Sequence, residues 1–168
     1  DHSHYAGQIG ALGGKNTNSL AKQTDLAIAV GTKLADFTTG SWTNFENENF
    51  KLVSINVSRF DANKHLAQAV VGDAKVSLDE LSQVLGEWKA SEEWNKKSQI
   101  ELKAWNEHVD KESAPTNQEV PSYVQVVGAV YRNSDPSDIA VTAAGGLVGE
   151  VIQVWRPREL NTHETEWG

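Results

Sequence analysis

Cysteine and methionine are absent from the 168 residues, and proline occurs only four times. Without cysteine the chain has no disulfide, no thiolate metal site and no cysteine nucleophile. Basic residues are also scarce, since 15 Lys and Arg stand against 23 Asp and Glu, a formal charge of −8. This balance argues against a nucleic-acid-binding surface. No apolar run approaches the length of a membrane span and no signal-peptide pattern occurs, so we expect a soluble, cytoplasmic protein that does not bind membranes.

The apolar run Leu26–Val30 ends at Gly31 and leads into a loop rich in hydroxyl groups. A continuous apolar run of this length predicts a strand buried on both faces, as in a parallel sheet. Because ligands bind beside the carboxyl ends of such strands, the loop is a candidate ligand crevice. Alternatively, its side chains only satisfy backbone groups within the loop. The residues concerned are Thr32, Asp36, Thr38, Thr39, Gly40 and Ser41.

Further strands and helices alternate along the first half of the chain. A helix from about residue 16 to 24, with Asn16 or Thr17 as its N-cap, precedes the first strand. Residues 51–57 and 69–71 predict two more strands, and Asp73 is placed to cap a helix over about 77–85. This alternation is typical of a doubly wound α/β domain with a parallel, Rossmann-like sheet.

The second half changes character. Residues 86–113 are rich in Lys and Glu, and Leu102, Trp105 and Val109 share one helical face, which predicts a charged helical connection between domains. A helix over 123–131, a buried strand over 138–142 and a helix or extended segment over 152–155 follow.

A glycine-rich loop, residues 143–149 (AAGGLVG), follows the strand over 138–142. Backbone N–H groups that no side chain hinders bind phosphate oxygens at a helix terminus or in a nest. An ordinary connection between strand and helix has the same composition, so the residues alone leave the two alternatives even.

Other motifs fail on spacing. Residues 10–17 (GALGGKNT) lack the first glycine of a P-loop, and no strand precedes them. His163-Glu164 has no second histidine, which excludes a zincin. His2 and His4 lie two residues apart in a terminal segment, where solvation is the simpler explanation than metal binding. No serine, histidine and acid can be assigned to one site.

Taken together, several sequence segments resemble those of thiamine diphosphate-dependent enzymes of the acetolactate synthase and pyruvate decarboxylase superfamily. Within it the similarity is greatest to the trihydroxycyclohexanedione hydrolases of myo-inositol catabolism. The phrase ADFTTGSW (35–42) is the most specific of them. The others are DHSHYAG (1–7), VGTKLADFTTGSW (30–42), KLVSINV (51–57), VVGDA (70–74), AAGGLVG (143–149) and EWG (166–168).

The resemblance implies two incomplete domains. Residues 1–85 would be the C-terminal half of a central α/β domain, 86–113 the connection, and 114–168 the truncated start of an α/β diphosphate-binding domain. Gly145, Gly146 and Leu147 would contact the diphosphate of the cofactor. Flavin-using relatives hold their flavin in the central domain, whereas other members hold nothing catalytic there.

The resemblance also implies that this chain is an inactive piece of a longer enzyme. The parent would use thiamine diphosphate and Mg²⁺ to hydrolyse a carbon–carbon bond in a cyclic dione, as a homodimer or homotetramer. The activating glutamate and the metal motif fall outside the 168 residues, so we expect no catalytic residue, no metal ligand and no bound cofactor in the fragment. The alternatives are a stand-alone nucleotide-binding or interaction module and a purely structural half-sheet that associates through its apolar edge.

Overall fold

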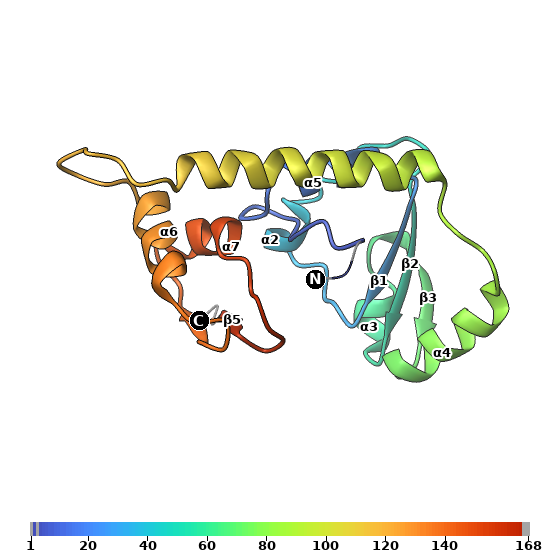
Figure 1. Ribbon diagram of the computed structural model, residues 1–168. Coiled ribbons are helices and arrows are strands. Elements are labelled where there is room, and N and C mark those ends of the chain that lie inside the picture. Colours follow the sequence, from blue (N-terminus) through green and yellow to red (C-terminus); the bar gives the residue numbers. More distant parts are fainter. Residues whose placement is uncertain (1, 3, 166–168) are drawn as a thin grey trace. The chain divides into compact units, whose positions relative to one another are not determined.

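The computed structural model describes residue 2 and residues 4–165, and these form two compact units. The three-stranded unit comprises Ile9–Ala11 and Asn18–Lys96, and the two-stranded unit comprises the rest of the described chain. Each unit contains helices and a parallel sheet, which confirms the predicted α/β class (Figure 1).

Three short strands form the sheet of the three-stranded unit, in the order β1 (Leu26–Val30), β2 (Lys51–Asn56) and β3 (Gln68–Val71). All pairs are parallel, with Ile28 opposite Val53 and Ile55 opposite Val70. Each strand comes from an apolar run that the sequence marks clearly, so all three predictions are confirmed. The connecting helices are α2 (Asp36–Thr39), α3 (Arg59–Ala62) and the 3₁₀ helix η1 (Lys64–Leu66), while α1 (Lys15–Gln23) precedes β1.

Ile55 of β2 is buried on one face of this sheet, and a larger apolar cluster covers the other face. Ala29, Leu34 and Leu52 are buried there, with Trp42 and Phe50 packed against them. Every second side chain of β1 points to the opposite face, and these side chains are exposed. They are Leu26, Ile28 and Val30. The prediction that this strand is buried on both faces is therefore wrong for the described residues, because β1 lies at the edge of the sheet and nothing described covers it.

Helix α4 (Ala74–Leu85) begins at a cap that the sequence predicts. The backbone of Asp73 is extended, and its carboxylate accepts a hydrogen bond of 3.0 Å from the Val76 N–H. This bond satisfies one of the N–H groups that the first helical turn leaves without a partner.

The predicted cap of α1 is wrong. The helix begins at Lys15, so Asn16 and Thr17 lie within its first turn. Their side chains bond upstream instead: Asn16 Nδ2 donates to the Ala6 carbonyl (2.9 Å) and Thr17 Oγ1 donates to the Gly14 carbonyl (3.0 Å). Both side chains therefore fix the preceding loop rather than the helix start.

The core of the two-stranded unit is a cluster of four buried valines. It joins α5 (Glu92–Glu112), α6 (Tyr123–Asn133) and α7 (Val148–Val154), and Trp105 and Trp155 pack against it. Trp105 and Val109 share the helical face that the sequence predicts. The four valines are Val109, Val127, Val151 and Val154.

Two parallel strands complete this unit, β4 (Ala140–Thr142) and β5 (His163–Thr165). β4 is shorter than predicted, and its central Val141 is 71% exposed, so the prediction of a buried strand is wrong for the described residues. β5 was not predicted, because it contains no apolar residue and its pairing with β4 links positions more than 20 residues apart.

Candidate functional site

The glycine-rich loop connects β4 to α7. At Gly145 the backbone φ is +148°, a conformation that favours glycine. A Cβ added at Gly145 or Gly146 would meet no atom within 4 Å, so the space beside both residues is open. Among the described residues, the backbone N–H groups of Gly145, Gly146 and Leu147 have no hydrogen-bond partner. The three residues thus offer accessible donors immediately before the first turn of α7, an arrangement that suits phosphate oxygens.

Two hydroxyl groups lie at the carboxyl edge of the two strands, and the imidazole of His163, from the start of β5, lies beside one of them. Thr142 Oγ1 lies 3.3 Å from Thr165 Oγ1, which in turn lies 3.4 Å from His163 Nε2. Burial lowers the pKa of His163 below its usual value, although the neighbouring Glu164 acts in the opposite direction. The lowered pKa favours the neutral form of the imidazole. Sequence reasoning missed this group, because it considered His163 only as part of a zincin motif and did not predict β5.

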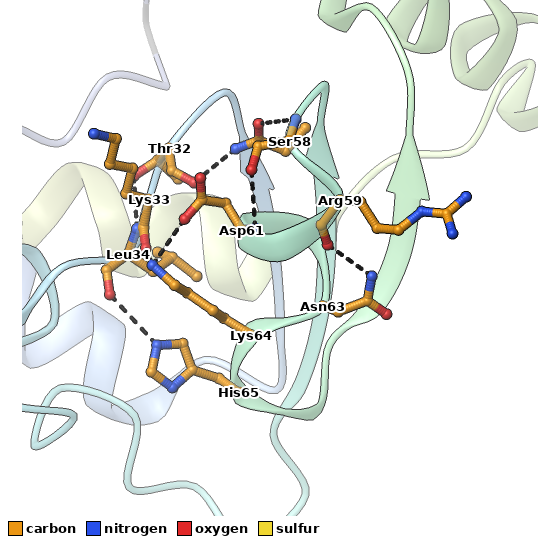
Figure 2. Close-up of polar contacts among 10 residues, drawn as sticks. Thr32, Lys33, Leu34, Ser58, Arg59, Asp61, Asn63, Lys64 and His65 are labelled. Atoms are coloured by element: carbon orange, nitrogen blue, oxygen red, sulfur yellow. Dashed lines mark hydrogen bonds and ion pairs between the residues drawn. The ribbon is translucent and has the colours of Figure 1, made fainter.

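The carboxyl edge of the three-stranded sheet is closed by its own hydrogen bonds (Figure 2). Thr32 Oγ1 accepts from the Leu34 N–H (3.2 Å). Asn56 donates to the Thr32 carbonyl (3.0 Å) and accepts from the Ser58 N–H (2.9 Å). Thr32 and Asn56, the polar residues that directly follow or end β1 and β2, are therefore engaged within the protein.

An ion pair lies beside these bonds (Figure 2). Lys64 Nζ lies 2.8 Å from Asp61 Oδ1 and also donates to the Lys33 carbonyl (3.2 Å). The hydrogen bond from Lys64, together with one from the Ser58 hydroxyl, lowers the pKa of Asp61. Since only 14% of the Asp61 side chain is exposed, this carboxylate is held in place and has a structural role.

The loop after β1 is organised in the same way. Thr39 is 2% exposed; its hydroxyl donates to the Ala35 carbonyl (3.3 Å) and accepts from the Trp42 N–H (3.1 Å). Gly40, with φ +57°, ends α2 as its left-handed C-cap. These bonds favour the structural alternative for the loop over a ligand crevice.

Aromatic stacking completes this loop. Trp42 and His65 both have left-handed backbone conformations (φ +70° and +56°), and their rings stack with centroids 3.9 Å apart. Trp42 also lies 5.1 Å from Phe45, which stacks on Phe50. Trp42 and Phe45 are both half-buried. The contacts offset the cost of the unusual backbone.

Among the described residues, no group of three or more His, Asp or Glu side chains is arranged to hold a metal ion. His2 and His4 pack edge to face, with centroids 5.3 Å apart, and the His4 N–H donates to His2 Nδ1. Among residue 2 and residues 4–165, no helix is both long enough and apolar enough to cross a membrane.

Comparison with known proteins gives a consistent result. Residues 1–81 match the central domain of thiamine pyrophosphate enzymes. The chain is 33% identical to a 3D-(3,5/4)-trihydroxycyclohexane-1,2-dione hydrolase of Clostridium tetani, over 96% of this chain and 29% of that protein. It is 32% identical to the hydrolase of the same name from Geobacillus thermodenitrificans, over 99% of this chain and 29% of that protein. The chain thus spans about 29% of the length of these curated relatives.

Proposed function

Because this chain belongs to the thiamine pyrophosphate enzyme family, we propose that it is part of a hydrolase that opens a cyclic dione. The relatives carry that activity in their name, and their similarity extends over nearly the whole chain. The reaction would cleave a carbon–carbon bond of trihydroxycyclohexanedione in inositol catabolism, in the cytoplasm. Thiamine diphosphate, when bound, would supply the nucleophilic carbon that this cleavage requires.

We further propose that Gly145, Gly146 and Leu147 bind the diphosphate of that cofactor. The observation that supports this role is the combination of open space at both glycines and three N–H groups without a partner among the described residues. The N–H groups would donate to the diphosphate oxygens, and the helix dipole of α7 would favour their negative charge. Gly146 would keep a Cβ out of the space that the phosphates need.

Neighbouring side chains would support this site. Thr142 and Thr165 hydroxyls lie at the same edge of the β4–β5 sheet and would hydrogen-bond to solvent or to phosphate oxygens. The partial burial of His163 favours its neutral form, so this side chain would add little charge to the site. We place the Mg²⁺ ligands and the activating glutamate in other parts of the longer protein.

The proposed domain division follows from the same relationship. Residues 1–85 would belong to the central domain, 86–113 to a connection, and 114–168 to the start of the diphosphate-binding domain. The remaining domains of the enzyme would be the partners of this chain, and the whole enzyme would form a homodimer or homotetramer. The chain alone would bind no cofactor and would be inactive.

The diphosphate site can be tested in the longer enzyme that contains this chain. We expect Gly146→Ala to weaken thiamine diphosphate binding at least tenfold, because the added methyl group would occupy the space that the phosphates need. The variant should fold normally, because the new Cβ meets no atom within 4 Å and the backbone at Gly146 does not have a positive φ. The matched control is Gly72→Ala in the three-stranded unit, where the new Cβ would lie 3.2 Å from the Ser77 hydroxyl, a side chain that can move. Equal cofactor affinities of the two variants would refute the assignment.

A further inference from the structure

His163 lies where it can direct a hydroxyl group at the carboxyl edge of the β4–β5 sheet. Thr142 and Thr165 are register partners that end the two strands, and two residues separate Thr142 from Gly145. His163 begins β5, and side chains two residues apart in a strand point to the same face. Its Nε2 therefore comes within 3.4 Å of Thr165 Oγ1, which lies 3.3 Å from Thr142 Oγ1. The edge that leads into the glycine-rich loop thus carries an imidazole and two hydroxyl groups in one row.

The direction of the Thr165 hydroxyl depends on the tautomer of His163. This hydroxyl has one proton and can accept two hydrogen bonds, one of them from the Thr142 hydroxyl. Where Nε2 of His163 carries no hydrogen, the imidazole accepts the Thr165 proton, and that proton is not available to a ligand. Where Nε2 carries the hydrogen, it donates to Thr165 Oγ1, and the Thr165 proton is free for an acceptor from outside.

Partial burial makes the neutral tautomers of His163 the relevant forms. Burial lowers the pKa of this imidazole, and Glu164 acts in the opposite direction. A neutral imidazole carries its hydrogen on one nitrogen only, so the choice of nitrogen decides where the Thr165 proton points. Ionised phosphate oxygens accept hydrogen bonds and do not donate them, so a bound diphosphate stabilises the tautomer with hydrogen on Nε2.

We propose that His163 is a positioning residue for the cofactor diphosphate. Its Nε2–H donates to Thr165 Oγ1 and so directs the Thr165 hydroxyl proton to a phosphate oxygen. The inference rests on the proposed function, because it takes the diphosphate to bind at Gly145, Gly146 and Leu147. It adds one charge-assisted O–H···O bond to the backbone donors of that loop. His163 acts through Thr165 and does not itself contact the cofactor.

The proposal is tested by calorimetric titration of thiamine diphosphate into the longer enzyme that contains this chain. Thr165→Val removes the hydroxyl, and His163→Leu removes the group that orients it, so we expect each to weaken binding about tenfold. Because both variants act through the same bond, the double variant should bind no more weakly than either single variant. Losses that multiply in the double variant, or affinity of His163→Leu within about twofold of wild type, would overturn the proposal.

His163→Gln separates positioning from packing. The glutamine amide keeps an N–H donor at about the reach of Nε2, so we expect this variant to bind thiamine diphosphate within about twofold of wild type. A loss as large as that of His163→Leu would overturn the positioning role. Should His163→Leu fail to fold, the ¹⁵N signals of His163 in the unaltered longer enzyme decide. With saturating thiamine diphosphate we expect the hydrogen on Nε2, and a bound form with hydrogen on Nδ1 alone would overturn the proposal.

Gly146→Ala distinguishes failure of this inference from failure of the proposed function. If Gly146→Ala leaves the affinity for thiamine diphosphate unchanged, the diphosphate site itself is refuted, and the role of His163 with it. If Gly146→Ala weakens binding but His163→Leu does not, the diphosphate site stands and only the positioning role is refuted.

Discussion

Val127 offers a sharp test of what holds α7, and with it the glycine-rich loop, in place. Its side chain is 4% exposed on α6 and contacts the valine cluster that α7 shares. Val127→Ala removes two buried methyl groups, each contributing about 0.8 kcal/mol, and leaves a cavity that adds to the loss. Alanine returns roughly 0.5 kcal/mol through its higher helix propensity. We therefore expect the free energy of unfolding of the two-stranded unit to fall by about 2 kcal/mol.

The same substitution at Val130 is the control. Val130 lies on the same helix but is 57% exposed, so Val130→Ala gains the same helix propensity and loses little packing; we expect a change within about 0.5 kcal/mol. Urea unfolding followed through the amide NMR signals of α6 and α7 measures both. With a slope of about 1–3 kcal/mol per molar urea, Val127→Ala should lower the midpoint by about 1 M. Equal midpoints for the two variants would refute this account of the core.

Three further predictions concern caps and charges. Asp73→Ala should destabilise the three-stranded unit by about 1 kcal/mol, measured by urea unfolding, because the Val76 N–H loses its acceptor; no change would contradict the cap. His163 has a lowered pKa in the folded protein, so the unfolded state takes up the proton first as the pH falls. Stability should therefore decrease as the pH drops below about 6.5, the usual histidine pKa. Thermal unfolding of His163→Gln should not show this decrease. Asp61 also has a lowered pKa, so its contribution to stability should be present above about pH 4 and lost as pH falls through the folded-state pKa; an unchanged acid limb in Asp61→Asn would contradict this.

Local features were predictable because neighbouring residues determine them. The strands β1, β2 and β3 follow from short apolar runs, and the Asp73 cap follows from an acidic residue placed just before an amphipathic segment. The exposed face of β1 was not predictable, because an apolar run does not reveal which strands and helices cover it. Pairing between β4 and β5 is likewise non-local, and the polar sequence of β5 gives no strand signal.

In the candidate site, too, local features were predictable from the sequence and non-local ones were not. The sequence alone placed accessible backbone donors at Gly145 and Gly146, since glycine after a strand is a local signal. It did not place His163 and Thr165 beside Thr142, because that proximity depends on β5. It left two alternatives for the loop after β1, and the hydrogen bonds of Thr39 and Asn56 favour the structural one.

The central claim is that this chain supplies part of a thiamine diphosphate-dependent hydrolase. The direct measurement is hydrolysis of the cyclic dione, with thiamine diphosphate and Mg²⁺ present, by this chain alone and by the longer enzyme that contains it. We predict no turnover by the chain alone, and turnover by the longer enzyme that disappears when thiamine diphosphate is withheld. Ring opening by the chain alone, or by the longer enzyme without thiamine diphosphate, would contradict the account.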